Sequence, residues 1–155
     1  HIPKGDLERA KEIASLTRDS GLEIAGYGSY YRLGQGMELR PSIETALAMG
    51  TGNVRIWAGG KASASLRKEE REELMAELSK AVEIAKDYGV VLNLEWHKNT
   101  LTDENESALC VLESISSPNL RTLWQPTQAL SFGERLNGAI ENKKYIKVIT
   151  MRKKD

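Results

Sequence analysis

The sequence predicts an α/β fold in which about five parallel strands alternate with helices and form part of an eight-stranded barrel. Three observations support this prediction. The 155 residues suit a single domain spanning 1–155, with enough chain to bury a core. Helix-like and strand-like patterns alternate five times with short turns, as right-handed βαβ units do. Polar residues recur on one face of several strands, as in a barrel interior near its working end.

Each expected strand is a short apolar run bounded by turn residues. The expected strands are residues 22–27, 53–57, 90–95, 120–125 and 145–150.

The expected helices carry apolar residues at helical spacing between helix-start and helix-stop residues. Asp6 is a good N-cap for the first helix, and Asp103 with Glu106 would form a capping box at the start of the fourth. A basic tail, residues 152–155, is expected to be solvated. The expected helices are residues 7–20, 41–49, 74–88, 103–115 and 129–140.

The faces of the strands favour a partial barrel over a flavodoxin-like doubly wound sheet, which is the alternative. In a doubly wound sheet helices cover both faces, so the strands are apolar on both sides. Here Leu92 and Leu94 form one face of the third strand, whereas Asn93 and Glu95 lie on the other. The second strand places Arg55 on its corresponding polar face. Five strands cannot close an eight-stranded barrel, so we expect a partial one.

Composition excludes several classes of protein. Twenty-two basic and 22 acidic side chains give a net charge of zero, which argues against general binding to nucleic acid. No apolar run approaches the ~20 residues that span a bilayer, so we expect no membrane association. The single cysteine, Cys110, fits a reducing, cytoplasmic compartment. Neither a GxGxxG nor a P-loop motif is present, so we expect no nucleotide cofactor.

One segment resembles a known signature. Residues 90–106 read VVLNLEWHKNTLTDENE, similar to the fifth-strand segment of the xylose isomerase-like sugar isomerase/epimerase superfamily, where a strand ends in Glu, followed by x-His and a T-L-T-D loop. Residues 1–34 and the NVRIWAGG strand at 53–60 agree with the same family. The resemblance implies a TIM barrel of which this chain covers about strands three to seven. Because the chain starts at His1 and lacks three strands of that barrel, we expect a fragment or a truncated reading frame.

The resemblance also implies a reaction: proton transfer next to a carbonyl of a sugar or sugar phosphate, assisted by a divalent metal (Mn, Mg, Co or Zn) in the full-length parent. Glu95 stands at the position of a metal ligand and catalytic group, and His97 at that of a catalytic or supporting group. Gln125 replaces an expected Asp ligand, and residues 147–151 offer no His. At most one strong ligand remains, so this chain alone is not expected to be a competent metalloisomerase.

Each candidate residue also has a purely structural interpretation. Glu95 could form an ion pair with Arg55 or Arg121, and His97 could be a loop histidine bonded to a neighbouring carbonyl. The residues that could bind substrate, and that could equally serve packing, are Tyr27, Tyr30, Trp57 and Gln125.

Other functions compete with the isomerase hypothesis. Two open sheet edges and an uncovered inner face would promote self-association, so a non-catalytic truncated barrel that forms homo-oligomers is one alternative. A metal-dependent abasic-site endonuclease is disfavoured by the neutral charge and by only two histidines. A flavodoxin-like binding domain lacks a supporting phosphate-loop motif.

Overall fold

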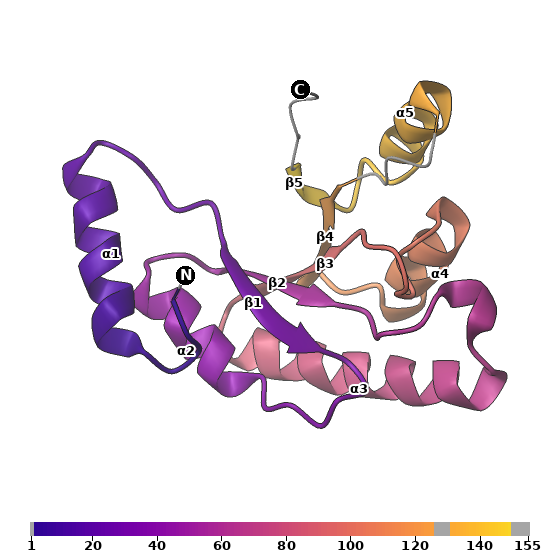
Figure 1. The fold of residues 1–155 in the computed structure, drawn as a ribbon, viewed down its shortest axis with the longest axis horizontal. Coiled ribbons are helices and arrows are strands. Elements are labelled where there is room, and N and C mark those ends of the chain that lie inside the picture. Colours follow the sequence, from indigo (N-terminus) through magenta and orange to yellow (C-terminus); the bar gives the residue numbers. More distant parts are fainter. Residues whose placement is uncertain (1, 126–130, 150–155) are drawn as a thin grey trace.

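The computed structural model describes residues 2–125 and 131–149. Strands and helices alternate along the chain around one parallel sheet (Figure 1). The strands are β1 (Tyr27–Arg32), β2 (Asn53–Trp57), β3 (Val91–Glu95), β4 (Leu120–Trp124) and β5 (Ile146–Ile149). The helices are α1 (Leu7–Asp19), α2 (Arg40–Ala48), α3 (Lys68–Asp87), α4 (Asn105–Ile115) and α5 (Phe132–Glu141), with a short 3-10 turn at Ser63–Ser65.

The order of the strands distinguishes a partial barrel from a doubly wound sheet. The sheet runs β1-β2-β3-β4-β5, and every strand pairs in parallel with its neighbour in the sequence. A doubly wound sheet reverses direction at a switch point and places its first strand inside the sheet, which does not happen here. The expectation of a partial barrel is therefore confirmed, and the flavodoxin-like alternative is wrong.

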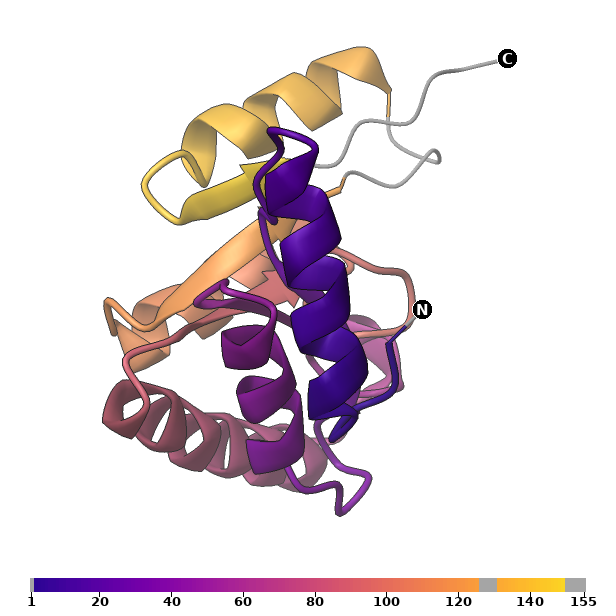
Figure 2. The same ribbon diagram turned by 90° about the vertical axis from the view of Figure 1, so that its left-hand side faces the viewer.

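The helices cover one face of the sheet. Right-handed connections between successive neighbouring strands place every connecting helix on the same side. Accordingly, α2 contacts β1 and β2, α3 contacts β3, and α4 contacts β4, whereas α1 packs on α2. Figure 2 shows β5 and α5 at one end of the molecule and α2 with α3 at the other.

The core lies between these helices and the sheet. Val54 pairs with Leu92, and Leu92 in turn pairs with Leu120, so one buried apolar row crosses three strands. Leu78 and Val82 of α3 are buried in the same core. The helix-facing half of each strand is therefore used for packing, and the opposite face remains for polar side chains.

The first strand starts later than predicted. The sequence predicts a strand over residues 22–27, but β1 begins at Tyr27, and Leu22 is exposed. Pairing sets this boundary, because β2 begins at Asn53 and the first registered pair is Tyr27 with Val54. An apolar run without a neighbouring strand makes no ladder of hydrogen bonds.

The other predicted boundaries agree within three residues, except that α3 begins at Lys68 and not at residue 74, because its first turns consist of charged residues that carry no apolar stripe. One capping prediction is also wrong. Asp103 does not cap α4; its carboxylate accepts a hydrogen bond from the Ser63 backbone N–H at 3.1 Å. Residues 129, 130 and 150 and the tail at 152–155 lie outside the described residues. Within the described part of the chain, no helix is long and apolar enough to cross a membrane.

A hydrogen-bonded carboxylate fastens the end of β1 to α3. Glu77 accepts from the Tyr31 hydroxyl at 3.1 Å and from the Gly34 backbone N–H at 2.8 Å. Burial, and then the Glu77 charge, raise the pKa of Tyr31, so its hydroxyl remains a donor at neutral pH. The link holds β1 in the position from which its inner residues face the site.

We predict that Glu77→Ala lowers the free energy of unfolding by about 1–2 kcal/mol, because two donors lose their acceptor and Tyr31 is buried. Urea denaturation measures this change. Glu73→Ala, an exposed position on the same helix, is the matched control and should stay within ~0.5 kcal/mol of the parent. Equal midpoints for the two variants would contradict the prediction.

Candidate functional site

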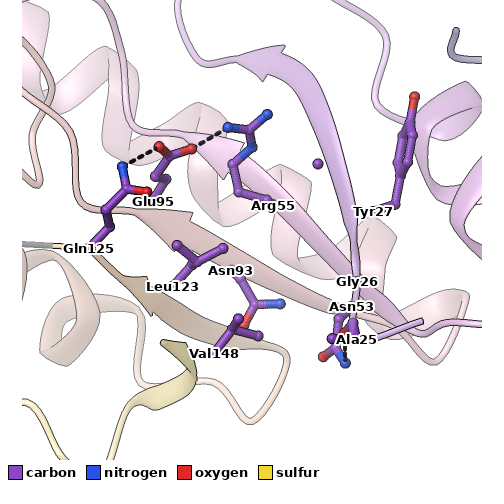
Figure 3. A pocket seen from close by; sticks show the side chains of 11 residues that line it. Ala25, Gly26, Tyr27, Asn53, Arg55, Asn93, Glu95, Leu123, Gln125 and Val148 are labelled. Carbon is purple, nitrogen blue, oxygen red and sulfur yellow. Dashed lines mark hydrogen bonds and ion pairs between the residues drawn. The ribbon is translucent and has the colours of Figure 1, made fainter. Parts of the chain in front are cut away.

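The face of the sheet opposite the helices carries a concave hollow of about 350 Å³ (Figure 3). Strand register sets part of its lining, because Gly28, Arg55 and Asn93 occupy one row across three strands. Arg121 is the next residue in that row but does not line the hollow. Both polar and apolar side chains line the hollow (Figure 3). The site uses the polar residues Arg55, Asn93, Glu95 and Gln125, and the apolar residues Leu123 and Val148 lie beside them.

Glu95 is the centre of this hollow. It ends β3, so it lies at the carboxyl edge of the sheet, where barrel enzymes place their active sites. Its Oε2 accepts from Arg55 Nη1 in an ion pair and from Trp57 Nε1 at 3.0 Å. Its Oε1 accepts from Gln125 Nε2 at 3.1 Å. The residue is only 6% exposed, so these donors replace the water that the carboxylate loses on folding.

Arg55 is held as firmly as its partner. Its Nη2 donates to the Ser29 carbonyl at 2.8 Å, and its guanidinium lies 4.4 Å from the centroid of the Trp57 ring. A Cβ atom at position 28 would lie 3.4 Å from Nη2, an ordinary van der Waals contact, so Gly28 lies directly beside this guanidinium. The expected ion pair of Glu95 is therefore made with Arg55.

Arg121 takes no part in that ion pair. Its Nη1 donates to the carbonyls of Ser117 and Leu120, at 3.0 and 2.9 Å. These bonds tie the side chain to the turn before β4, although the register of the sheet would also have allowed an inner position.

His97 follows β3 and lies beside the Glu95 cluster. Its ring centroid is 5.8 Å from that of Trp57, whose indole N–H contacts Glu95. Its Nδ1 lies 2.7 Å from the Lys98 carbonyl, as the structural interpretation expected. Because a carbonyl can only accept, Nδ1 is the ring nitrogen that donates a proton in this contact, and Nε2 is left without this partner.

The loop after the strand fixes both backbones. Thr102 Oγ1 donates to the Glu95 carbonyl and Thr100 Oγ1 to the His97 carbonyl, each at 2.7 Å. Both threonines are fully buried. The T-L-T-D part of the signature therefore acts on the backbone of the two candidate residues.

Two of the predicted substrate-binding residues direct their polar groups elsewhere, although Tyr27 is among the residues that line the hollow. The Tyr27 hydroxyl donates to the Ile2 carbonyl at 2.9 Å, and its ring points away from Glu95 in Figure 3. Burial raises the pKa of Tyr27, so this donor stays protonated. Trp57 does not line the hollow and contacts Glu95 through its N–H. We therefore leave the Tyr27 side chain out of the proposed site.

The other two lie at the hollow or its rim. Gln125 lines the hollow and holds Glu95. Tyr30 is 57% exposed and stacks edge-on against Trp57, with ring centroids 5.6 Å apart. Asn93 was missed as a candidate, although strand alternation already placed it on the polar face; its Oδ1 is buried with no hydrogen-bond partner among the described residues.

The described residues do not form a site for a divalent metal. No group of three or more His, Cys, Asp or Glu side chains among them could hold one. Among the described residues, Glu95 is the only carboxylate that lines the hollow, and the Arg55 guanidinium beside it would repel a divalent cation. Gln125 turns its amide N–H, a donor, toward Glu95. In this arrangement Arg55, and not a metal ion, neutralises the negative charge of Glu95.

Comparison with known proteins places the chain that carries this site in a family. A family model described as xylose isomerase-like TIM barrel matches residues 2–152. A 3-dehydroshikimate dehydratase from Bacillus anthracis is 27% identical over 123 residues, covering 75% of this chain and 44% of the relative.

Two solved structures share the fold. A probable 3-DHS dehydratase, AsbF, from Bacillus anthracis superposes with a TM-score of 0.74 at 23% identity, covering 90% of this chain and 54% of that protein. The IOLI protein, solved with a bound zinc atom, gives a TM-score of 0.65 at 15% identity, covering 90% and 55%. The chain thus spans about half the length of the proteins it matches.

We predict that the chain binds Mn²⁺ and Zn²⁺ no more tightly than about 0.1 mM, because Glu95 is engaged by three donors and lacks partner ligands. Calorimetric titration of the chain measures this affinity, and Glu95→Gln should leave it unchanged. A tight, one-to-one site that disappears in Glu95→Gln would contradict the prediction.

Proposed function

Because the chain belongs to the xylose isomerase-like TIM barrel family, we propose that it carries the proton-transfer groups of an enzyme for small hydroxylated carbonyl compounds. One observation carries this proposal: Glu95 is a buried carboxylate at the carboxyl edge of the sheet, turned into the hollow and held through both oxygens. A positioned carboxylate in a partly desolvated hollow is suited to take a proton from carbon.

Arg55 gives this proton transfer an electrostatic basis. When Glu95 takes a proton from a carbon next to a carbonyl, its negative charge passes to the substrate oxygen. The Arg55 guanidinium, which the carboxylate neutralises beforehand, then faces that new charge without reorganising. The ion pair thus keeps the Arg55 cation in position to stabilise the negative charge that develops on the substrate.

His97 is the second proton carrier. Its Nε2 is the ring atom left to exchange a proton, because Nδ1 is engaged with the Lys98 carbonyl. A dehydratase needs an acid that protonates the departing hydroxyl, and an epimerase needs an acid that returns a proton to carbon. His97 beside the Glu95 cluster would fill either role with a proton that its Nε2 takes up from solvent before the reaction and regains afterwards.

The relatives favour dehydration as the outcome. The characterised relative is named a 3-dehydroshikimate dehydratase. Isomerisation or epimerisation of a sugar or sugar phosphate is the second outcome that the same groups would support, since it too begins with proton abstraction next to a carbonyl. The two outcomes differ only in whether a hydroxyl leaves after that first step.

The test incubates the protein in D₂O with 3-dehydroshikimate and, separately, with ketoses and their phosphates, and follows deuterium uptake at carbon by NMR. We expect Glu95→Gln to lower the exchange rate at least ~100-fold, because the amide cannot accept the proton. His97→Asn should lower product formation ~10- to 100-fold and leave more of the first exchange intact.

Glu73→Gln, exposed on α3, is the matched control for the loss of one carboxylate. Wild-type exchange rates in Glu95→Gln would overturn the proposed function. Release of water from 3-dehydroshikimate would select the dehydratase, and label scrambling in a ketose would select the isomerase.

Association of copies is a second candidate function, favoured by an apolar row on α5. Phe132, Leu136 and Ile140 are 74%, 48% and 55% exposed and recur every fourth residue on that helix. The strands β1 and β5 end the described sheet, so each offers an edge for pairing. A row of this kind next to an open edge promotes contact with a second copy.

Sedimentation velocity tests this candidate. We expect a dimer or larger species at micromolar concentration that Phe132→Ser shifts toward monomer, because the most exposed apolar side chain is lost. Leu47→Ser, exposed on α2, is the control and should leave the distribution unchanged. A monomeric parent chain would rule the candidate out.

A further inference from the structure

We propose that Trp57 is a positioning residue, which fixes the Glu95 carboxylate by its indole N–H while Arg32 and Arg55 hold its ring in place. This inference rests on the proposed function, because Glu95 is the group that it positions. Trp57 does not line the hollow, so this role differs from the substrate binding that the sequence predicted for it.

A carboxylate at the end of a flexible side chain needs an external constraint. The terminal torsion of glutamate is broad, so the side chain itself does not choose the plane of the carboxylate. Here each oxygen has its own neutral donor: Trp57 Nε1 at 3.0 Å from Oε2 and Gln125 Nε2 at 3.1 Å from Oε1. One donor at the end of β2 and one just after β4 therefore define the plane in which Glu95 meets a substrate.

The indole is itself held by two cations. The Arg32 guanidinium lies 4.3 Å and the Arg55 guanidinium 4.4 Å from the centroid of the Trp57 ring. Each guanidinium is anchored to backbone, Arg32 through the Gly59 carbonyl and Arg55 through the Ser29 carbonyl, both at 2.8 Å. The ring thus cannot rotate its N–H away from Glu95 without breaking these contacts.

The other tryptophans of the chain show that packing alone does not demand such a bond. The indole N–H groups of Trp96 and Trp124 are buried and have no hydrogen-bond partner among the described residues. Trp57 Nε1, in contrast, donates to a buried carboxylate oxygen that also carries the ion pair. Trp96 and Trp124 can therefore serve as internal controls for the indole N–H of Trp57.

The first test removes only the N–H. Trp57→Phe keeps an aromatic ring for the two arginines, and we expect kcat of the exchange reaction to fall about 10- to 100-fold with KM changed less than about threefold. Trp124→Phe removes an unpartnered N–H and should leave both constants near the parent values. Trp57→His returns a ring N–H to the Nε1 position and should recover part of the lost kcat. Equal constants in Trp57→Phe and Trp124→Phe would overturn the proposal.

A second measurement does not depend on activity. In protein labelled with ¹⁵N-tryptophan, the three indole signals are assigned through the Trp→Phe variants. We expect Glu95→Gln to move the Trp57 signal and to leave that of Trp124 in place. An unchanged Trp57 signal would overturn the positioning role. If Glu95→Gln instead retains full exchange activity, the proposed function fails while the indole signal still decides whether Trp57 holds Glu95.

Discussion

The ion pair between Arg55 and Glu95 is the interaction on which the rest of the inner face depends. Both side chains are largely removed from water, 18% and 8% exposed, so each charge requires the other. Arg55 in turn reaches the backbone of β1 at Ser29, and Glu95 reaches β4 through Gln125. One charge pair on two central strands thereby connects four strands at their carboxyl ends, and loss of either partner would leave a buried charge uncompensated.

One face of the sheet stabilises the fold, and the other carries the candidate site. The helix-facing row, with Val54, Leu92 and Leu120, supplies the apolar burial that stabilises the fold. The described helices pack on the other side, so the opposite row can hold charges, amides and a glycine. Arg55, Glu95 and Gln125 are tolerated there because they bond to one another and to backbone, and the same arrangement gives the hollow its chemistry. Asn93 Oδ1, in contrast, has no hydrogen-bond partner among the described residues.

The elements with strong local signals could be predicted closely. The turn residues around β2 and β3 need no distant partner to be recognised. The apolar spacing of α3 predicted its core-facing part but missed the charged first turns from Lys68. The start of β1 could not, because a strand begins where a neighbour is available and not where apolar residues begin. Glu95 was found because strand end and family signature coincide. The direction of the Tyr27 side chain was not predicted, because it depends on the hydrogen bond of its hydroxyl to the distant Ile2 carbonyl.

The sequence by itself determined the alternation of helices and strands, the polar face of β3 and the position of Glu95 at its end, because these follow from periods of 3.6 and 2 residues along the chain. Only the tertiary structure decided which cation neutralises Glu95 and that Trp57 donates to it while Arg121 bonds to the turn before β4. The physical reason is that periodicity assigns a side chain to a face, whereas its partners depend on the register of neighbouring strands and on competition among nearby donors and acceptors.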